Sequence, residues 1–200
     1  MDSLSILLVK INPFRPKFNV KYLIFGAKNA IMEKKRIFTE IRRRRGEKMD
    51  KWDARFMEMA WVISNWASCF QPNRKIGCVI VKNKRIVTTG YNGAPAGIKT
   101  CVERGECLRQ KLGIASGTRA ELCYAVHAEQ NAIIQAARLG SSIDGATLYC
   151  THQPCVLCAK MIVNAGIKRV VYREGYPDDF AREMLSEGGV ALERFQPEEE

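Results

Sequence analysis

No apolar run in this sequence approaches the roughly 20 residues that a membrane-spanning helix needs. The short apolar run at residues 4–9 also lacks the pattern of a secretory signal, because no basic segment precedes it and no small-residue cleavage site follows it. No internal repeat is visible. We therefore expect neither a membrane protein, nor an exported protein, nor a repeat array.

Acidic residues are few beside basic ones: 21 Asp and Glu against 32 Lys and Arg give a formal net charge of +11. The excess is not spread evenly. Residues 1–48 hold 13 basic and 4 acidic residues, whereas residues 49–200 hold 19 and 17, a net charge of only +2. A nearly neutral segment gives little reason to expect a polynucleotide-binding surface, so we predict neither a nucleic-acid nor a membrane partner for residues 49–200.

Residues 1–48 are therefore interpreted separately from a predicted catalytic domain at residues 49–200. A block of basic residues can be a disordered arm that binds nucleic acid or a membrane surface. The alternative is a mis-assigned start. The segment Arg-Arg-Arg-Gly-Glu-Lys just before Met49 is what a purine-rich ribosome-binding site would encode if translated, and we favour Met49 as the first residue.

Eight cysteines without a secretory signal indicate a reducing compartment, so we predict a cytoplasmic protein whose cysteines are thiols or metal ligands. Three of them, Cys101, Cys107 and Cys123, surround a polar insert at residues 100–124 and are candidate ligands of a second, structural zinc ion. Its fourth ligand is open, with Cys69 unassigned. Free thiols on a flexible loop are an equally good interpretation.

The motif H-A-E and the later motif P-C-x-x-C carry the chemistry. His127, Cys155 and Cys158 are three ligands that suit Zn²⁺, and three protein ligands leave a position for water, as a catalytic zinc requires. Glu129 stands two residues from His127, where it faces a different direction and could act on that water as a general acid and base. The combination predicts a catalytic zinc centre.

Both motifs are predicted to open helices. Residues 128–138 are rich in helix formers, so His127 and Glu129 begin a helix. Pro154 suits the start of a second helix at residues 155–165, where the positive end of the helix dipole favours thiolates. A structural zinc knuckle or a redox C-x-x-C pair is the competing interpretation, but neither explains the carboxylate beside the histidine.

These motifs resemble the zinc-dependent nucleobase and nucleotide deaminases, whose pattern is H-x-E followed by P-C-x-x-C. Further segments resemble the deoxycytidylate (dCMP) deaminase branch: G-Y-N-G-A-P-A-G at residues 90–97, the cysteine-containing insert, H-A-E-Q-N-A-I, and A-G-I-K-R-V-V-Y at residues 165–172. The resemblance covers most of residues 52–195. Related dCMP deaminases also carry an extra metal site in the insert.

The resemblance implies hydrolysis of dCMP to dUMP and ammonia, which feeds dTMP synthesis. Glu129 would take a proton from the attacking water and return protons to N3 and to the leaving amine at C4. Asn92 would contact the sugar, although turn chemistry explains an Asn there nearly as well. Arg74 and Lys75, just before the first strand, are our candidates for binding the 5′-phosphate. The resemblance further implies a homohexamer regulated by dCTP and dTTP.

Two other functions stay open: a nucleic-acid base deaminase acting on tRNA adenosine or single-stranded cytosine, and a non-catalytic zinc module. For the fold, the periodicity predicts a helix, a hairpin, and then alternating helices and strands. That order predicts an α/β protein, a three-layer α-β-α sandwich with a mixed five-stranded sheet. It resembles the cytidine-deaminase fold.

Overall fold

The computed structural model describes residues 51–115, 118–175 and 178–196. The chain divides into two units, Met1–Lys48 and Met49–Glu200, and all described residues belong to the second. The predicted basic extension, residues 1–48, therefore lies outside the described residues. No helix in the described ranges has the length and apolar character needed to cross a bilayer.

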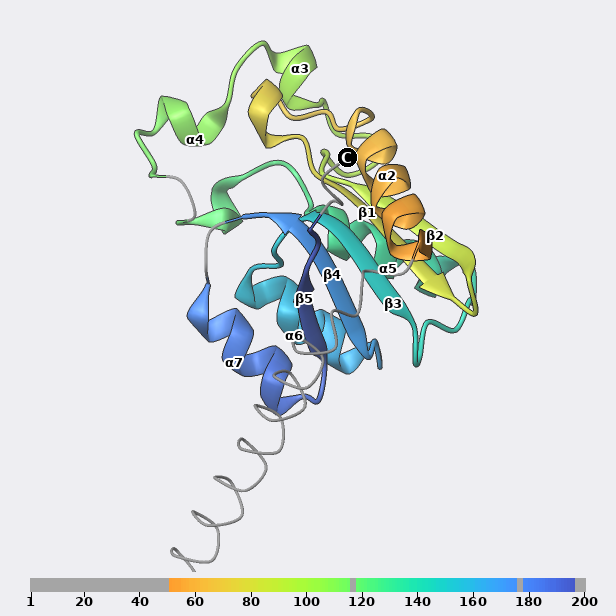
Figure 1. Ribbon diagram of the computed structural model, residues 1–200. Helices are drawn as coiled ribbons and strands as arrows, with labels where there is room; N and C mark the ends of the chain where they lie inside the picture. The colour runs from red at the N-terminus through yellow and green to blue at the C-terminus, as the bar shows by residue number, and fades with distance from the viewer. Residues whose placement is uncertain (1–50, 116–117, 176–177, 197–200) are drawn as a thin grey trace, which may run out of the picture. The chain divides into compact units, whose positions relative to one another are not determined.

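A mixed sheet of five strands runs through the second unit, in the order β2-β1-β3-β4-β5 (Figure 1). The strands are β1 (Gly77–Lys82), β2 (Arg85–Tyr91), β3 (Thr147–His152), β4 (Arg169–Glu174) and β5 (Ala191–Arg194). β1 pairs antiparallel with β2 and with β3, whereas β4 runs parallel to both β3 and β5. The predicted mixed five-stranded sheet is confirmed.

The hairpin between β1 and β2 follows from its two turn residues. Lys82 pairs with Arg85, which leaves Asn83 and Lys84 as the loop, and these have φ of 53° and 60°. Positive φ at both positions is the type I′ geometry, whose twist matches that of the strands. The predicted turn at Asn83-Lys84 is thereby confirmed.

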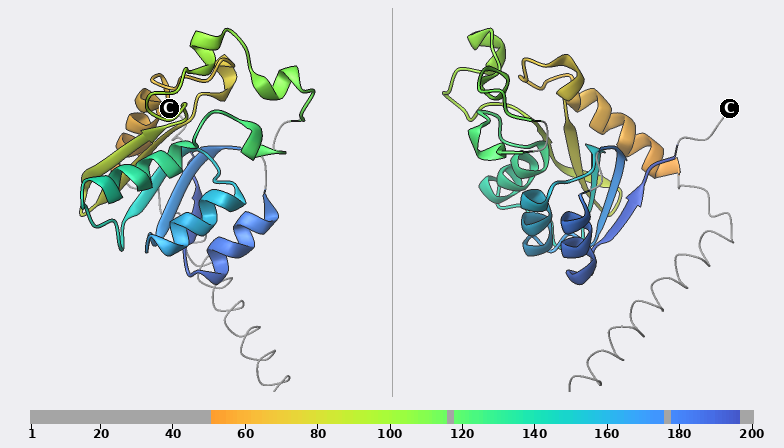
Figure 2. Two further views of the ribbon diagram at one scale, coloured as in Figure 1. Left: turned by 180° about the vertical axis from the view of Figure 1, so that it is seen from behind. Right: turned by 90° about the vertical axis from the view of Figure 1, so that its left-hand side faces the viewer.

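Helices cover both faces of the sheet (Figure 2). One face carries α2 (Lys51–Ser64), and the other carries α5 (Ala128–Arg138), α6 (Val156–Asn164) and α7 (Asp179–Glu187). The predicted three-layer α-β-α sandwich is therefore confirmed.

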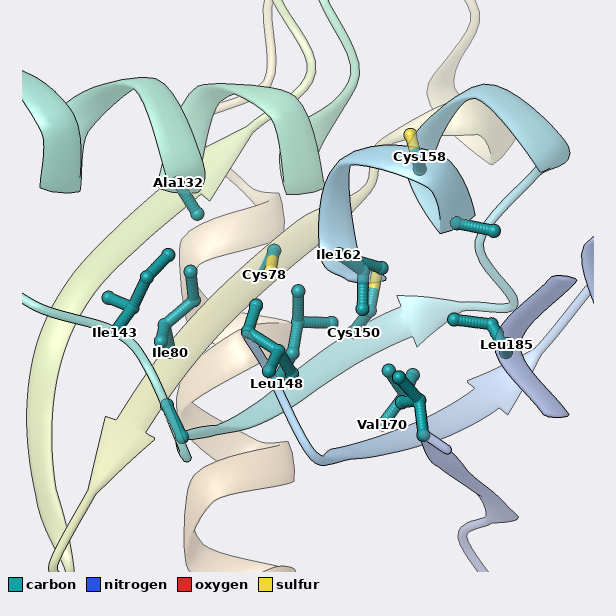
Figure 3. Close-up of a cluster of buried hydrophobic side chains, with 14 of the residues drawn as sticks. Cys78, Ile80, Ala132, Ile143, Leu148, Cys150, Cys158, Ile162, Val170 and Leu185 are labelled. Atoms are coloured by element: carbon teal, nitrogen blue, oxygen red, sulfur yellow. The ribbon is translucent and has the colours of Figure 1, made fainter. Parts of the chain in front are cut away.

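The core has two parts because the central strands are buried on both faces. Alternate residues of β1 face opposite sides: Val79 and Val81 pack toward α2, and Cys78 and Ile80 pack toward the other three helices. Figure 3 shows the larger of these two clusters, which joins β1, β3 and β4 to α5, α6 and α7. This packing fixes α5 and α6, which carry the two predicted metal-binding motifs.

The insert at residues 100–124 joins β2 to α5 and contains only short helices, α3 (Cys101–Arg104), α4 (Leu108–Lys111) and a 3₁₀ turn at Ala120–Leu122. α3 depends on a capping box. Thr100 Oγ1 accepts a hydrogen bond from Glu103 N at 3.1 Å, and Glu103 Oε2 accepts one from Thr100 N at 2.7 Å. Cys101 is the one buried residue of α3 and α4, so the insert is held together mainly by local bonds.

Candidate functional site

The fold brings His127, Cys155 and Cys158 together from two helices. His127 Nδ1 lies 3.5 Å from Cys155 Sγ and 3.4 Å from Cys158 Sγ. The ligand atoms of the three residues all lie within 4.8 Å of one another, and no other trio of His, Cys, Asp or Glu in the described ranges does so. Two residues that are 28 positions apart in sequence thus meet at one point.

These distances fit a metal ion. A tetrahedral zinc with Zn–N of about 2.0 Å and Zn–S of about 2.3 Å requires N···S separations of about 3.5 Å. The two observed N···S distances have this length. One imidazole and two sulfurs are ligands that zinc binds, and three of them leave a fourth position for water. The residues present therefore fit a catalytic zinc ion.

His127 is positioned as the N-cap of α5. The side chain of Gln130 accepts a hydrogen bond from His127 N at 3.1 Å, which fixes the start of the helix. Asn131 Nδ2 also donates to Tyr91 O at 2.7 Å, so the first turn of α5 is tied to the end of β2. The predicted helix start at His127 is confirmed.

Gly90 allows α5 to lie directly on β2. A Cβ atom at this position would stand 2.2 Å from the carbonyl oxygen of Ala128 and 2.5 Å from the amide of Ala132. Both distances are too short for any side chain, so the close approach requires glycine. The glycine that begins the G-Y-N-G-A-P-A-G segment therefore helps to set the position of His127 and Glu129.

Cys155 is the N-cap of α6 and follows the buried Pro154. The start of this helix has a partner that the sequence analysis missed. Asp178 Oδ2 accepts from Val156 N at 3.1 Å, and Asp178 Oδ1 accepts from Ala181 N at 2.8 Å, so one carboxylate caps both α6 and α7. An Asp three residues before Ala181 was a readable N-cap signal for α7. Its bond to α6 depends on tertiary packing.

The pKa values of the Cys155 and Cys158 thiols are shifted in opposite directions. Hydrogen bonding from Cys158, and then from His127, lowers the pKa of Cys155 to about 4. Its hydrogen bond with Cys155, together with burial, raises the pKa of Cys158. Hydrogen bonding to Cys155 also raises the pKa of His127. A bound divalent cation would deprotonate both thiols, because a coordinating thiol loses its proton outright.

Glu129 is buried beside this centre, with 4% of its surface exposed. Burial raises the pKa of its carboxyl group, and the charge of His127 opposes that shift. The carboxyl also interacts with the thiol of Cys158. A carboxyl group whose pKa is moved toward neutrality can both accept and donate a proton near pH 7.

Arg74 and Lys75, two of the three predicted substrate-binding residues, lie just before β1, and the third, Asn92, follows β2 and contacts that segment. Asn92 is buried, its Oδ1 accepts from Ile76 N at 2.8 Å, and its Nδ2 donates to Arg74 O at 2.8 Å. Asn92 therefore braces the backbone of residues 74–76, and its contact with a sugar stays a prediction. The side chains of Arg74 and Lys75 are half-buried and make no hydrogen bond or ion pair within the described part of the chain. Their role in binding phosphate also stays a prediction.

The structure adds a fourth thiol to the three of the insert. Burial is the main cause that raises the pKa of Cys69 and of Cys101, and each is raised further by the charges of Cys107 and Cys123. The charge of Cys69 also raises the pKa of Cys101. These charge effects indicate that the four thiols are near one another, but within the described residues no three of them have the ligand spacing of the first centre.

Comparison with protein families agrees with this geometry. The family model described as the cytidine and deoxycytidylate deaminase zinc-binding region matches residues 50–174 of the chain. That span contains both motifs and the whole insert.

Individual relatives support the same family assignment. The deoxycytidylate deaminase of Schizosaccharomyces pombe is 38% identical over 151 residues, which make up 74% of this chain and 45% of that protein. ComE operon protein 2 of Bacillus subtilis is 36% identical over 149 residues, 74% of this chain and 73% of that protein. The chain therefore spans less than half the length of the S. pombe protein.

A solved structure is similar over the same region. The dCMP deaminase of cyanophage S-TIM5 in complex with dCMP and dUMP is 33% identical, with a TM-score of 0.61. The similarity covers 74% of this chain and 100% of the phage chain.

Proposed function

Because the chain belongs to the cytidine and deoxycytidylate deaminase family, we propose that it hydrolyses dCMP to dUMP and ammonia with a zinc cofactor. The observation that carries this proposal is the centre itself. His127 and the two thiols have the separations of a tetrahedral zinc site, and a buried carboxyl group with a raised pKa lies against one of them. The S-TIM5 structure, a dCMP deaminase with dCMP and dUMP, supports the choice of substrate.

Zinc bound by His127, Cys155 and Cys158 would supply the Lewis acidity that makes water a strong nucleophile near neutral pH. Glu129 accepts the proton that the water loses as its oxygen attacks C4 of the cytosine ring. The carboxyl group then donates that proton to N3. Glu129 next takes the proton of the new hydroxyl group at C4 and passes it to the amine, so the C4–N bond breaks, ammonia leaves and the C4 carbonyl of uracil forms. Burial of Glu129 favours this role because its raised pKa makes the carboxylate a stronger base toward the water proton, while a carboxyl group can still return that proton near neutral pH.

Replacement of Glu129 by Gln tests the mechanism. The amide keeps the size of the side chain but cannot accept a proton, so turnover of dCMP should fall by several powers of ten, since each proton transfer contributes roughly 10²–10⁴-fold. Zinc content, measured by mass spectrometry, should stay at the wild-type level. An exposed glutamate on α7, Glu183, provides the matched control, and Glu183→Gln should behave as wild type. Activity retained in a zinc-loaded Glu129→Gln protein would contradict the mechanism.

The substrate is tested separately with the wild-type protein. Free dCMP, single-stranded DNA and tRNA are offered in parallel, and release of ammonia is measured. We expect only dCMP to react, because residues 49–200 carry a net charge of just +2 and offer little attraction for a polynucleotide. Reaction with DNA or tRNA alone would favour a nucleic-acid deaminase, and reaction with none would favour a non-catalytic zinc module.

We propose in addition that Cys69, Cys101, Cys107 and Cys123 bind a second, structural zinc ion. Four thiolates form a closed tetrahedral site, which needs no water position. The charges of Cys107 and Cys123 act on both Cys69 and Cys101, which supports this grouping with Cys69 as the proposed fourth ligand. A metal there would hold together an insert that otherwise depends on local hydrogen bonds.

For the whole protein, we propose a cytoplasmic homohexamer regulated by dCTP and dTTP, with residues 49–200 as the deaminase domain and Met49 as its start. Exposed apolar side chains on and just after α2, those of Trp61, Val62 and Trp66, support association between copies. Light scattering coupled to size exclusion, with and without each nucleotide, measures the oligomer and its response.

A further inference from the structure

The turn that carries Cys155 is bound by the chain that follows β4. The pairing of β3 with β4 ends at Glu174. Immediately beyond it, Gln153 N donates to Glu174 O at 2.7 Å. On the other side of Cys155, Val156 N donates to Asp178 Oδ2 at 3.1 Å. The metal-binding turn is therefore attached to this part of the chain both before and after Cys155.

The two segments approach closely just after β4. Gly175 has a φ of 133°, a value that side chains other than glycine rarely adopt. A Cβ atom at Gly175 would also stand 2.8 Å from Gln153 N, so the contact leaves no room for a side chain. Further along, α7 lies beside α6 on the same face of the sheet (Figure 1). The end of β4 and the start of α7 thus enclose the turn.

Asp178 supplies an acceptor that Cys155 cannot supply. Ser, Thr, Asp and Asn are preferred at an N-cap because their side-chain oxygen accepts a hydrogen bond from the first turn of the helix. Cys155 holds this position but has no such oxygen, and its side chain makes no capping hydrogen bond to the first turn of α6. The Asp178 carboxylate accepts from the first residue of α6, Val156, instead. Its other oxygen accepts from Ala181 N at 2.8 Å, so each oxygen serves one helix.

The bond to Val156 affects both thiols because they share the first turn of α6, with Cys155 as the N-cap and Cys158 as the third residue. Helix ends fray, and the first N–H groups of a helix need acceptors from outside it. A frayed first turn would move the two sulfurs from the 3.5 and 3.4 Å that now separate them from His127 Nδ1. The turn would then have to be ordered when a metal binds, and that entropy cost lowers the affinity.

From these contacts we infer that Asp178 is a positioning residue of the zinc centre, which holds Cys155 and Cys158 in the arrangement that binds the metal. It acts through the backbone of Val156 and not through the substrate. The inference rests on the zinc centre of the proposed function but not on dCMP as the substrate. Groups outside the ligand set that orient the ligands typically contribute roughly 10- to 100-fold to metal affinity.

Three substitutions separate this role from the capping of α7. Asp178→Ala removes both acceptor oxygens. Asp178→Asn and Asp178→Ser keep one oxygen, which is enough to cap α7 because Asn and Ser are as good as Asp at an N-cap, but they leave none for Val156 N. All three should weaken zinc binding at the first centre by roughly 10- to 100-fold. Asp179→Asn, at the exposed first residue of α7, removes the same charge and should bind zinc as wild type does.

Zinc affinity is measured on the full-length proteins by competition with chelators of increasing strength. Mass spectrometry counts the zinc ions that each chain retains, and circular dichroism verifies that each variant is folded. Cys158→Ser lacks a ligand of the first centre, so the ion missing from it identifies which step of zinc release belongs to that centre.

The pattern across the variants decides the inference. Weaker zinc binding in Asp178→Ala alone would mean that Asp178 only caps α7, and an equal loss in Asp179→Asn would assign the effect to charge. Unchanged zinc binding in all three Asp178 variants would mean that the thiols are positioned without it. Each of these results overturns the inference while wild type still deaminates dCMP. Absence of deamination in zinc-loaded wild type would instead refute the proposed function, and zinc release would still decide the role of Asp178.

Discussion

The two groups of thiols in this protein are built in different ways. Cys155 and Cys158 lie at the start of α6, which packs on the sheet, and the fold alone brings them within ligand distance of His127. The four thiols around the insert lie on short elements and in loops, and they are near one another without reaching that spacing. We infer that the first centre is preformed by the fold, whereas the second is completed when it binds metal.

The pKa values of the thiols also differ between the two groups. At the first centre hydrogen bonds from neighbouring ligands lower the pKa of Cys155 to about 4, so a thiolate is present at neutral pH. At the second group burial raises the pKa of Cys69 and of Cys101. Metal binding must displace protons at both groups, from Cys158 at the first centre and from Cys69 and Cys101 at the second, so binding at each should weaken as the pH falls.

Loss of a ligand from the first centre should have the largest effect on activity. Cys158→Ser removes one of three ligands, so deaminase activity should fall to background and the zinc content should drop by one ion per chain. The protein should stay folded, because α5 and α6 are held by the large apolar cluster and not by the metal. Circular dichroism and zinc analysis test this together. A Cys158→Ser protein that unfolds when zinc is lost would mean that the first centre, too, depends on its metal.

Loss of a ligand from the second group should act mainly on stability. Cys107→Ser should remove the other zinc ion and lower the free energy of unfolding by roughly 4 kcal/mol, since loss of a metal is among the largest effects of single substitutions. Residual deaminase activity should be measurable, because His127, Cys155, Cys158 and Glu129 are unchanged. Wild-type protein with only one zinc ion per chain would remove the second site altogether.

The difference between the two groups also explains what the sequence could predict. His127, Cys155 and Cys158 lie at helix starts that local sequence signals predict. The alternation of helices and strands predicts the three layers of the fold. The partners of Asn92 and the second bond of Asp178 join segments far apart in the chain. Such contacts follow from packing, which no local spacing encodes.

Asp178 illustrates the same limit. In the sequence it is one of 21 acidic residues, and its neighbours indicate only that it caps a helix. Only the structure shows that its second oxygen accepts from Val156 N, next to a metal ligand. Arg74 and Lys75 were chosen from their place before a strand, a signal that contains no information about distance from the metal centre.

The smallest effect is expected from removal of residues 1–48. Both thiol groups, together with His127 and Glu129, lie between Cys69 and Cys158. A chain that starts at Met49 should therefore match the full chain in zinc content, melting temperature and kcat/KM for dCMP.

Two measurements decide this last prediction. Mass spectrometry of the native protein should find an N-terminal peptide that begins at Met49, and the shortened chain should keep both zinc ions through a thermal melt. A native peptide covering residues 9–28 would refute Met49 as the start. Loss of one zinc ion from the shortened chain would mean that residues 1–48 support the second thiol group. Metal binding by that group would then depend on the basic segment as well as on its own thiols.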